Sequence, residues 1–157
     1  LWLLYDYIYS IVSTSMIDEF QIEVYKKPDM TVEQRNSLYI KIRNEYFDKY
    51  PPNVYNAFGK GIIWDNAFHI YCAPFYAIDY ALSATTALQI WNMAKTDFDS
   101  AFETYMRVVE SPFTPLGIEA VCIFAGLNNP FEEGLLESVS EMLTSKFKKS
   151  DTAKKAA

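Results

Sequence analysis

The chain has 157 residues, of which half are apolar, and it carries a formal net charge of −6 with a single histidine. This length and apolar content suit one folded domain and exclude a disordered chain. An acidic chain does not provide the basic face that nucleic-acid binding needs, so we expect no nucleic acid among its partners. The sequence also has no run of about 18 apolar residues, which a membrane-spanning helix needs, so we expect no membrane partner.

Helical periodicity dominates the first third of the chain. Apolar spacing predicts a buried helix over 1–16, which continues to about residue 26 and ends before Pro28. Thr31 and Gln34 form a capping box, because a threonine at the N-cap and a glutamine three residues later satisfy each other's backbone donors. A second helix is therefore predicted from Thr31 to about Tyr46.

The middle of the chain alternates between helices and chain breaks. Two glycines predict a loop over 56–61. A short helix is expected over 64–69, and Pro74 interrupts it because proline cannot donate a backbone hydrogen bond. The segment 75–95 is predicted to be the longest uninterrupted helix.

Three more helices are expected in the last third of the chain. Thr96 and Asp97 offer an N-cap, and a short helix over 116–125 is closed by Gly126. Asn129 is expected to cap the last helix, with a proline at the first helical position. The apolar residues at helical spacing after the first of these caps are Phe98, Ala101, Phe102, Tyr105 and Val109. Those expected to form the core face of the last helix are Leu135, Leu136, Val139, Met142 and Leu143.

The sequence shows no strand alternation and no internal repeat. We therefore predict an all-α helical bundle with about six to eight helices. Residues 1–149 are predicted to form a single all-helical domain. Residues 150–157 lack core residues and are predicted to be a flexible tail.

The candidate functional residues surround the only histidine of the chain. His69 lies five residues before Pro74, and Tyr76 and Tyr80 follow one helical turn apart. From the residues alone, His69 is either a satisfied core histidine or a hydrogen-bond donor, and the tyrosines are either core residues or phenols aimed at a ligand. Asp65 could orient the imidazole or share a metal, but a structural contact is favoured because two ligands do not make a zinc site.

Five further residues with charged or reactive side chains are given structural roles. Asp18, Glu19 and Glu23 are interpreted as a solvated helix face, since the sequence shows no environment that would separate their pKa values as an acid–base pair requires. Cys72 and Cys122 are interpreted as reduced, buried thiols of a cytoplasmic protein, because two cysteines in a chain of this length do not make a disulfide framework.

Three blocks of motifs follow one another along the chain. The blocks are IDEFQ (17–21) with VY (24–25) and PDMT (28–31), then HI (69–70) with PFY (74–76) and IDYAL (78–82), and finally PFEEG (130–134). In their order and spacing, from about residue 17 to residue 145, they resemble the C-terminal part of oligoendopeptidase F, a zinc metallopeptidase of the M3, or thimet oligopeptidase-like, family.

The resemblance implies the helical part of a larger enzyme that cuts short peptides inside a deep channel. In that family the zinc is held by two histidines of an H-E-x-x-H motif and a downstream glutamate, with the motif's own glutamate as general base. The resemblance also implies that His69, Tyr76 and Tyr80 hydrogen-bond the bound peptide and the developing oxyanion. They would then be both catalytic and substrate-binding residues.

The chain departs from the family in its metal chemistry. It contains no H-E-x-x-H motif, so we expect no zinc bound to this chain and no peptidase activity from it alone. The complete enzyme is expected to carry zinc. Ala67 and Ala77 stand where the family usually has glutamine and tyrosine, which leaves open which tyrosine contacts the substrate.

The leading hypothesis is therefore a C-terminal segment of a zinc-dependent oligoendopeptidase. Its partners would be short peptide substrates and the missing N-terminal zinc-binding part. An alternative is a non-enzymatic helical module that binds peptides or a partner protein, since tyrosine is enriched at interfaces. A third hypothesis is a bare fragment that self-associates through its exposed channel face.

Overall fold

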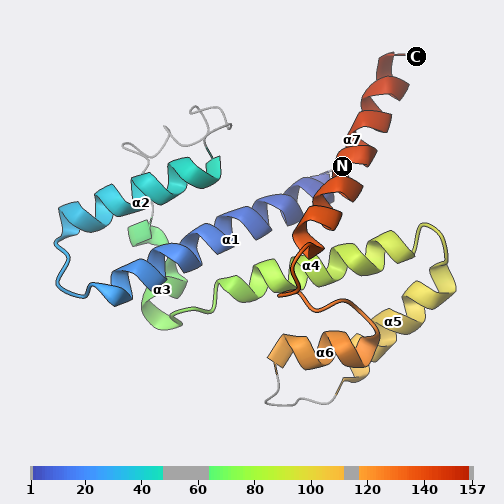
Figure 1. Cartoon of the computed structure of the whole chain (residues 1–157), viewed down its shortest axis with the longest axis horizontal. Coiled ribbons are helices and arrows are strands. Elements are labelled where there is room, and N and C mark those ends of the chain that lie inside the picture. The colour runs from blue at the N-terminus through green and yellow to red at the C-terminus, as the bar shows by residue number, and fades with distance from the viewer. Residues whose placement is uncertain (1, 48–63, 112–116, 156–157) are drawn as a thin grey trace. The chain divides into compact units, whose positions relative to one another are not determined.

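The computed structural model describes residues 2–47, 64–111 and 117–155, and within these ranges the chain is helical without any strand. The predicted all-α class is therefore confirmed. Along the chain the elements are α1 (Trp2–Lys26), α2 (Val32–Phe47), the 3-10 helix η3 (Trp64–Asn66), α3 (Phe68–Cys72), α4 (Ile78–Met93), α5 (Phe98–Glu110), α6 (Gly117–Ala125) and α7 (Leu135–Lys155) (Figure 1). None of the helices described combines the length and hydropathy that crossing a membrane requires.

The chain divides into two compact units, one ending at Ala81 and the other beginning at Leu82. The single domain expected over 1–149 stays a prediction. Helix α7 reaches Lys155, so the last helix extends past residue 149, where the tail was expected to begin. The loop expected over 56–61 lies outside the described residues.

In the first unit, α1 and α2 lie side by side as an antiparallel hairpin (Figure 1). The Thr31 amide donates to Gln34 Oε1 at 2.8 Å, and the Gln34 amide donates to Thr31 Oγ1 at 3.3 Å. The predicted capping box at the start of α2 is therefore confirmed. The buried core between the two helices consists of Met16, Phe20, Tyr39, Ile42 and Phe47.

The polar side of α1 is less exposed than expected. Glu19 is half-buried and accepts a hydrogen bond from the Tyr46 hydroxyl at 2.8 Å. Burial also raises the pKa of Asp18. The solvated position predicted for Glu19 is wrong, because Tyr46 on α2 reaches this side of α1. Glu23 forms an ion pair with Lys26 at 2.7 Å.

In the second unit, the buried thiol of Cys122 on α6 is the centre of a small core. Residues of α4, α5 and α6 pack around this core, namely Ile90, Met93, Val108 and Ile118. The Thr86 hydroxyl lies 3.7 Å from the Cys122 sulfur. The Leu127 amide donates to the Cys122 carbonyl at 2.8 Å, and Gly126, with φ 78°, donates to the Ile123 carbonyl at 3.1 Å. This Schellman motif confirms the helix end predicted at Gly126.

Two helices begin later than predicted. Helix α4 starts at Ile78 rather than at residue 75, because Phe75 has a left-handed φ of 65° that no α-helix contains. It therefore has 16 residues, and α1, with 25, is the longest helix described. Helix α7 starts at Leu135 and is not capped by Asn129. The Asn129 Oδ1 instead accepts a hydrogen bond from the Phe131 amide at 3.0 Å, which closes a local turn. Gly134, just before α7, has a positive φ of 87°.

Several side chains that were expected in the core are exposed. Ala101 and Thr104 are the buried residues of α5. The large apolar residues of α5 lie on an adjoining, solvent-facing side: Phe98, Phe102, Tyr105 and Val109. Leu136 on α7 is exposed as well, and so is Cys72, whose predicted burial is wrong. Helical spacing identified these apolar faces without showing which of them another element covers.

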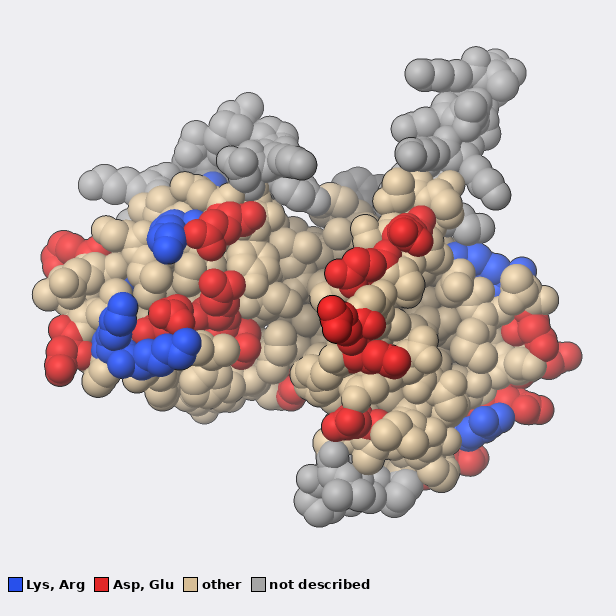
Figure 2. Space-filling model, viewed as in Figure 1, with Lys and Arg blue, Asp and Glu red and all other residues tan. Residues whose placement is uncertain are grey.

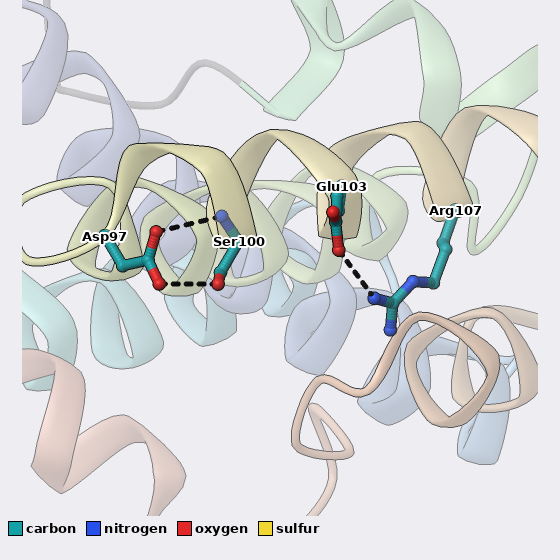
Figure 3. A network of polar contacts seen from close by, with 4 residues as sticks. All are labelled: Asp97, Ser100, Glu103 and Arg107. Carbon is teal, nitrogen blue, oxygen red and sulfur yellow. Dashed lines mark hydrogen bonds and ion pairs between the residues drawn. The ribbon is translucent and has the colours of Figure 1, made fainter.

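The polar side of α5 begins with a capping interaction (Figure 3). Asp97 accepts the Ser100 amide at 3.0 Å and the Ser100 hydroxyl at 2.6 Å, which confirms the predicted N-cap. Further along, Glu103 pairs with Arg107 at 3.6 Å. On the visible face of the second unit, acidic side chains also gather over α6 and the first part of α7 (Figure 2).

The cap at Asp97 predicts a pH-dependent stability. Hydrogen bonds from Ser100 lower the pKa of Asp97. A carboxylate with a depressed folded pKa stabilises the fold above its unfolded pKa, and this contribution is lost as the pH falls through the folded pKa. Asp97→Asn keeps a good cap but cannot titrate. Urea unfolding should therefore show the wild type gaining stability over Asp97→Asn between about pH 2 and pH 7. A pH-independent difference would contradict this prediction.

Candidate functional site

The candidate site is built on α3, which is anchored to the core of the first unit. Trp64, in the short helix before α3, donates from Nε1 to Asn36 Oδ1 at 2.8 Å. Its ring lies 5.6 Å from the buried Phe20 ring, and Ile70 packs against the same core. These contacts fix the segment that contains η3 and α3. Helix α3 then presents His69 half-buried at its side.

The two site tyrosines are set by the start of α4. The Tyr76 amide donates to the Ala73 carbonyl at 3.1 Å, which closes the turn before the helix. Ala77 and Ala81 are buried, whereas Tyr76 and Tyr80 are 43% and 44% exposed. Residues four apart share one face of a helical turn. The small alanines therefore pack inward and both phenols reach the surface.

The structure brings the three predicted site residues together. The His69 and Tyr76 rings stack with their centroids 5.3 Å apart and an interplanar angle of 26°. The Tyr80 ring stands edge-on to both, at 5.9 Å from His69 and 5.4 Å from Tyr76. One imidazole and two phenols thus form a continuous aromatic surface, the His69–Tyr76–Tyr80 cluster.

The phenols of the cluster are suited to donating hydrogen bonds. A hydrogen bond with the Tyr76 side chain raises the pKa of Tyr80, and partial desolvation raises it further. Tyrosine phenols keep their proton at neutral pH, and a neutral phenol can donate to a ligand oxygen. The interaction also couples the orientation of one hydroxyl to that of the other.

Two aromatic residues that were not predicted as site residues, Tyr25 and Phe75, contact each other at the turn before Tyr76. The Phe75 ring lies 5.0 Å from the Tyr25 ring of α1, in an edge-on contact at 61°. In the sequence, Pro74 predicts that the helix is interrupted here, but it does not predict the left-handed conformation of Phe75. No hydrogen bond or ion pair joins Asp65 to His69 in the described part of the chain. Burial raises the pKa of Tyr39 to about 12, and the negative charge of Asp65 contributes to this rise.

The described residues do not form a metal centre. Within 2–47, 64–111 and 117–155, no group of three or more histidine, cysteine, aspartate or glutamate side chains is placed to hold a metal ion. Zinc takes three or four protein ligands. These parts of the chain therefore do not fit a zinc site.

Two solved peptidases share this arrangement of helices. An oligoendopeptidase F is 32% identical to this chain, and the two structures superpose with a TM-score of 0.77. The match covers 90% of this chain and 25% of the oligoendopeptidase F chain. The chain has the fold of one quarter of an oligoendopeptidase F. PZ peptidase A, solved with an inhibitor, is 27% identical with a TM-score of 0.79, over 93% of this chain and 26% of its own. The sequence matches no family model and no curated protein.

The resemblance to oligoendopeptidase F that the three motif blocks indicated is therefore confirmed. The match extends over nine-tenths of the chain. The chain spans about a quarter of either solved peptidase. Most of an oligoendopeptidase F thus lies outside the segment that this chain matches.

Proposed function

We propose that this chain forms part of the wall of the peptide-binding channel in a zinc-dependent oligoendopeptidase. His69, Tyr76 and Tyr80 donate hydrogen bonds to the bound peptide and to the oxyanion that develops during hydrolysis. The zinc ligands and the general base come from the part of the enzyme that this chain does not contain.

The convergence of the three rings is the observation that carries this proposal. Their centroids lie 5.3–5.9 Å apart, and both phenols are more than two-fifths exposed. Tyrosines that only fill a core are buried with their hydroxyls satisfied inside the protein. Phenols that stand at the surface beside the only imidazole can instead reach a peptide carbonyl.

The expected chemistry is electrostatic. Negative charge grows on the carbonyl oxygen of the peptide bond as it is attacked. A neutral phenol held in place donates its proton toward that oxygen without reorganising, and such a preformed donor stabilises the transition state more than the ground state. A tyrosine phenol has an ordinary pKa of about 10 and is therefore protonated, and able to donate, across the neutral pH range.

Peptide binding by the chain itself tests the proposal. The probe is a blocked five-residue alanine peptide, and the readout is the NMR signal of the His69 imidazole, which is unique because the chain has one histidine. The peptide should shift this signal in a saturable manner, and Tyr76→Phe with Tyr80→Phe should weaken binding. Tyr105→Phe, at an exposed position on α5, is the matched control. A signal that the peptide leaves unchanged would contradict the proposal.

A second candidate is a protein-binding module, and one separate observation favours it. The aromatic side of α5 leaves Phe98 and Phe102 exposed by 69% and 54%, with their rings stacked 6.4 Å apart. Exposed aromatic stripes of this kind occur at protein interfaces. A native polypeptide no larger than this chain would favour this candidate over the peptidase.

A further inference from the structure

The turn that joins α3 to α4 has an unusual residue at its third position. The turn runs from Ala73 to Tyr76, and the Tyr76 amide donates to the Ala73 carbonyl at 3.1 Å. Pro74 occupies the second position, and Phe75, at the third, has a φ of 65°. These are the features of a type II β-turn, in which glycine is the favoured third residue because it adopts positive φ without strain. A bulky aromatic residue there is strained.

A contact from α1 accompanies the strained residue. Tyr25 lies in the last turn of α1, and its ring meets the Phe75 ring edge-on with the centroids 5.0 Å apart. Edge-on packing of this kind is attractive beyond its buried area. The contact therefore opposes the relaxation of Phe75 to an ordinary backbone conformation. Both rings are partly exposed, so substitutions here remove little of the core.

The conformation of the turn decides where the site tyrosines lie. The His69 carbonyl accepts the Ala73 amide at 3.0 Å on one side of the turn. On the other side, the Tyr76 carbonyl accepts the Asp79 amide at 3.1 Å, in the first turn of α4. A change of φ at the residue between them would swing the Tyr76 ring away from the His69 ring, with which it stacks at 5.3 Å.

We propose that Tyr25 and Phe75 are positioning residues, which hold the turn before α4 in its left-handed form and thereby keep Tyr76 stacked on His69. A role of this positioning in catalysis rests on the proposed function, whereas the stacking of Tyr76 on His69 can be measured in this chain alone. Strained backbone of this kind persists only where surrounding contacts enforce it, and it is frequent at functional sites.

The single histidine makes the test direct. A stacked phenol ring moves the imidazole proton signals of His69 upfield, and Tyr76→Ala defines the signal without that ring. Tyr25→Ala and Phe75→Ala should both shift the His69 signals toward this reference. Tyr25→Phe keeps the ring and should retain the wild-type signals. Phe75→Gly should retain them too, because glycine adopts positive φ without the ring contact.

The contrast between glycine and alanine at position 75 separates positioning from general damage. Wild-type His69 signals in both Tyr25→Ala and Phe75→Ala would overturn the proposal. A Phe75→Gly variant shifted as far as Phe75→Ala would overturn it as well, since the left-handed turn would then not be what matters. Failure of the alanine peptide to bind the wild type would instead bear only on the proposed function, because none of these spectra contains a peptide.

Discussion

Replacing His69 by alanine, or Tyr80 by phenylalanine, is expected to lower kcat by roughly 10²–10³-fold in an active enzyme that contains this segment. The enzyme to use is a hybrid in which this chain replaces the matching quarter of oligoendopeptidase F. A donor aimed at the developing oxyanion interacts more strongly with the transition state than with the bound peptide, so its loss lowers kcat while KM changes little. Steady-state kinetics with a fluorogenic peptide measure both constants.

Two comparisons make this kinetic test specific. Tyr105→Phe removes one phenol from an exposed position on α5 and should leave kcat unchanged. The double variant His69→Ala with Tyr80→Phe should lose less than the product of the single losses, because the two rings are in contact. A rise in KM at unchanged kcat would show uniform substrate binding only, and would contradict the oxyanion role.

Replacing Phe20 by alanine is expected to destabilise the first unit by about 3–5 kcal/mol. Phe20 is 2% exposed, and its ring contacts Tyr39 edge-on at 5.4 Å and Trp64 at 5.6 Å. The substitution leaves a cavity between α1, α2 and the segment that carries α3. Because Trp64 anchors that segment, we also expect the His69 imidazole signal to broaden or move.

The matched control for this substitution is Phe124→Ala. Phe124 is 55% exposed on α6, and substitutions at such positions usually change the free energy of unfolding by less than about 0.5 kcal/mol. Urea unfolding followed by far-UV circular dichroism gives both values. Equal midpoints for the two variants would show that Phe20 is not a core residue of the first unit.

Local sequence signals predicted the helix boundaries where a side chain or a glycine satisfies the backbone. The capping box at Thr31, the N-cap at Asp97 and the Schellman glycine at Gly126 each depend on residues within a few positions of one another. All the residues that form such a cap can be recognised in one short stretch of sequence. These signals predicted the start of α2, the start of α5 and the end of α6.

The remaining features depend on contacts that no local pattern contains. Phe75 takes the conformation of a glycine, beside a ring contributed by Tyr25, fifty residues earlier in the chain. Gln21 is 1% exposed, although its amide has no hydrogen-bond partner in the described part of the first unit. Asn129 closes a turn instead of capping a helix, since asparagine suits either structure.

The candidate site was predictable in part. The i, i+4 spacing of Tyr76 and Tyr80 placed both on one face, and the only histidine drew attention to His69. That the imidazole stacks on the first phenol could not be read from the spacing, because the turn at Pro74 and Phe75 sets the direction in which the chain returns. The roles of the three side chains in catalysis stay predictions.

The size and activity of the native polypeptide test the central claim most directly. An antibody against this segment would capture the polypeptide from its source cells, and peptide hydrolysis would be measured with and without a zinc chelator. We predict a polypeptide far larger than the 18.1 kDa of this chain, with hydrolysis that the chelator abolishes and zinc restores. A polypeptide of about 18 kDa without peptidase activity would contradict the claim.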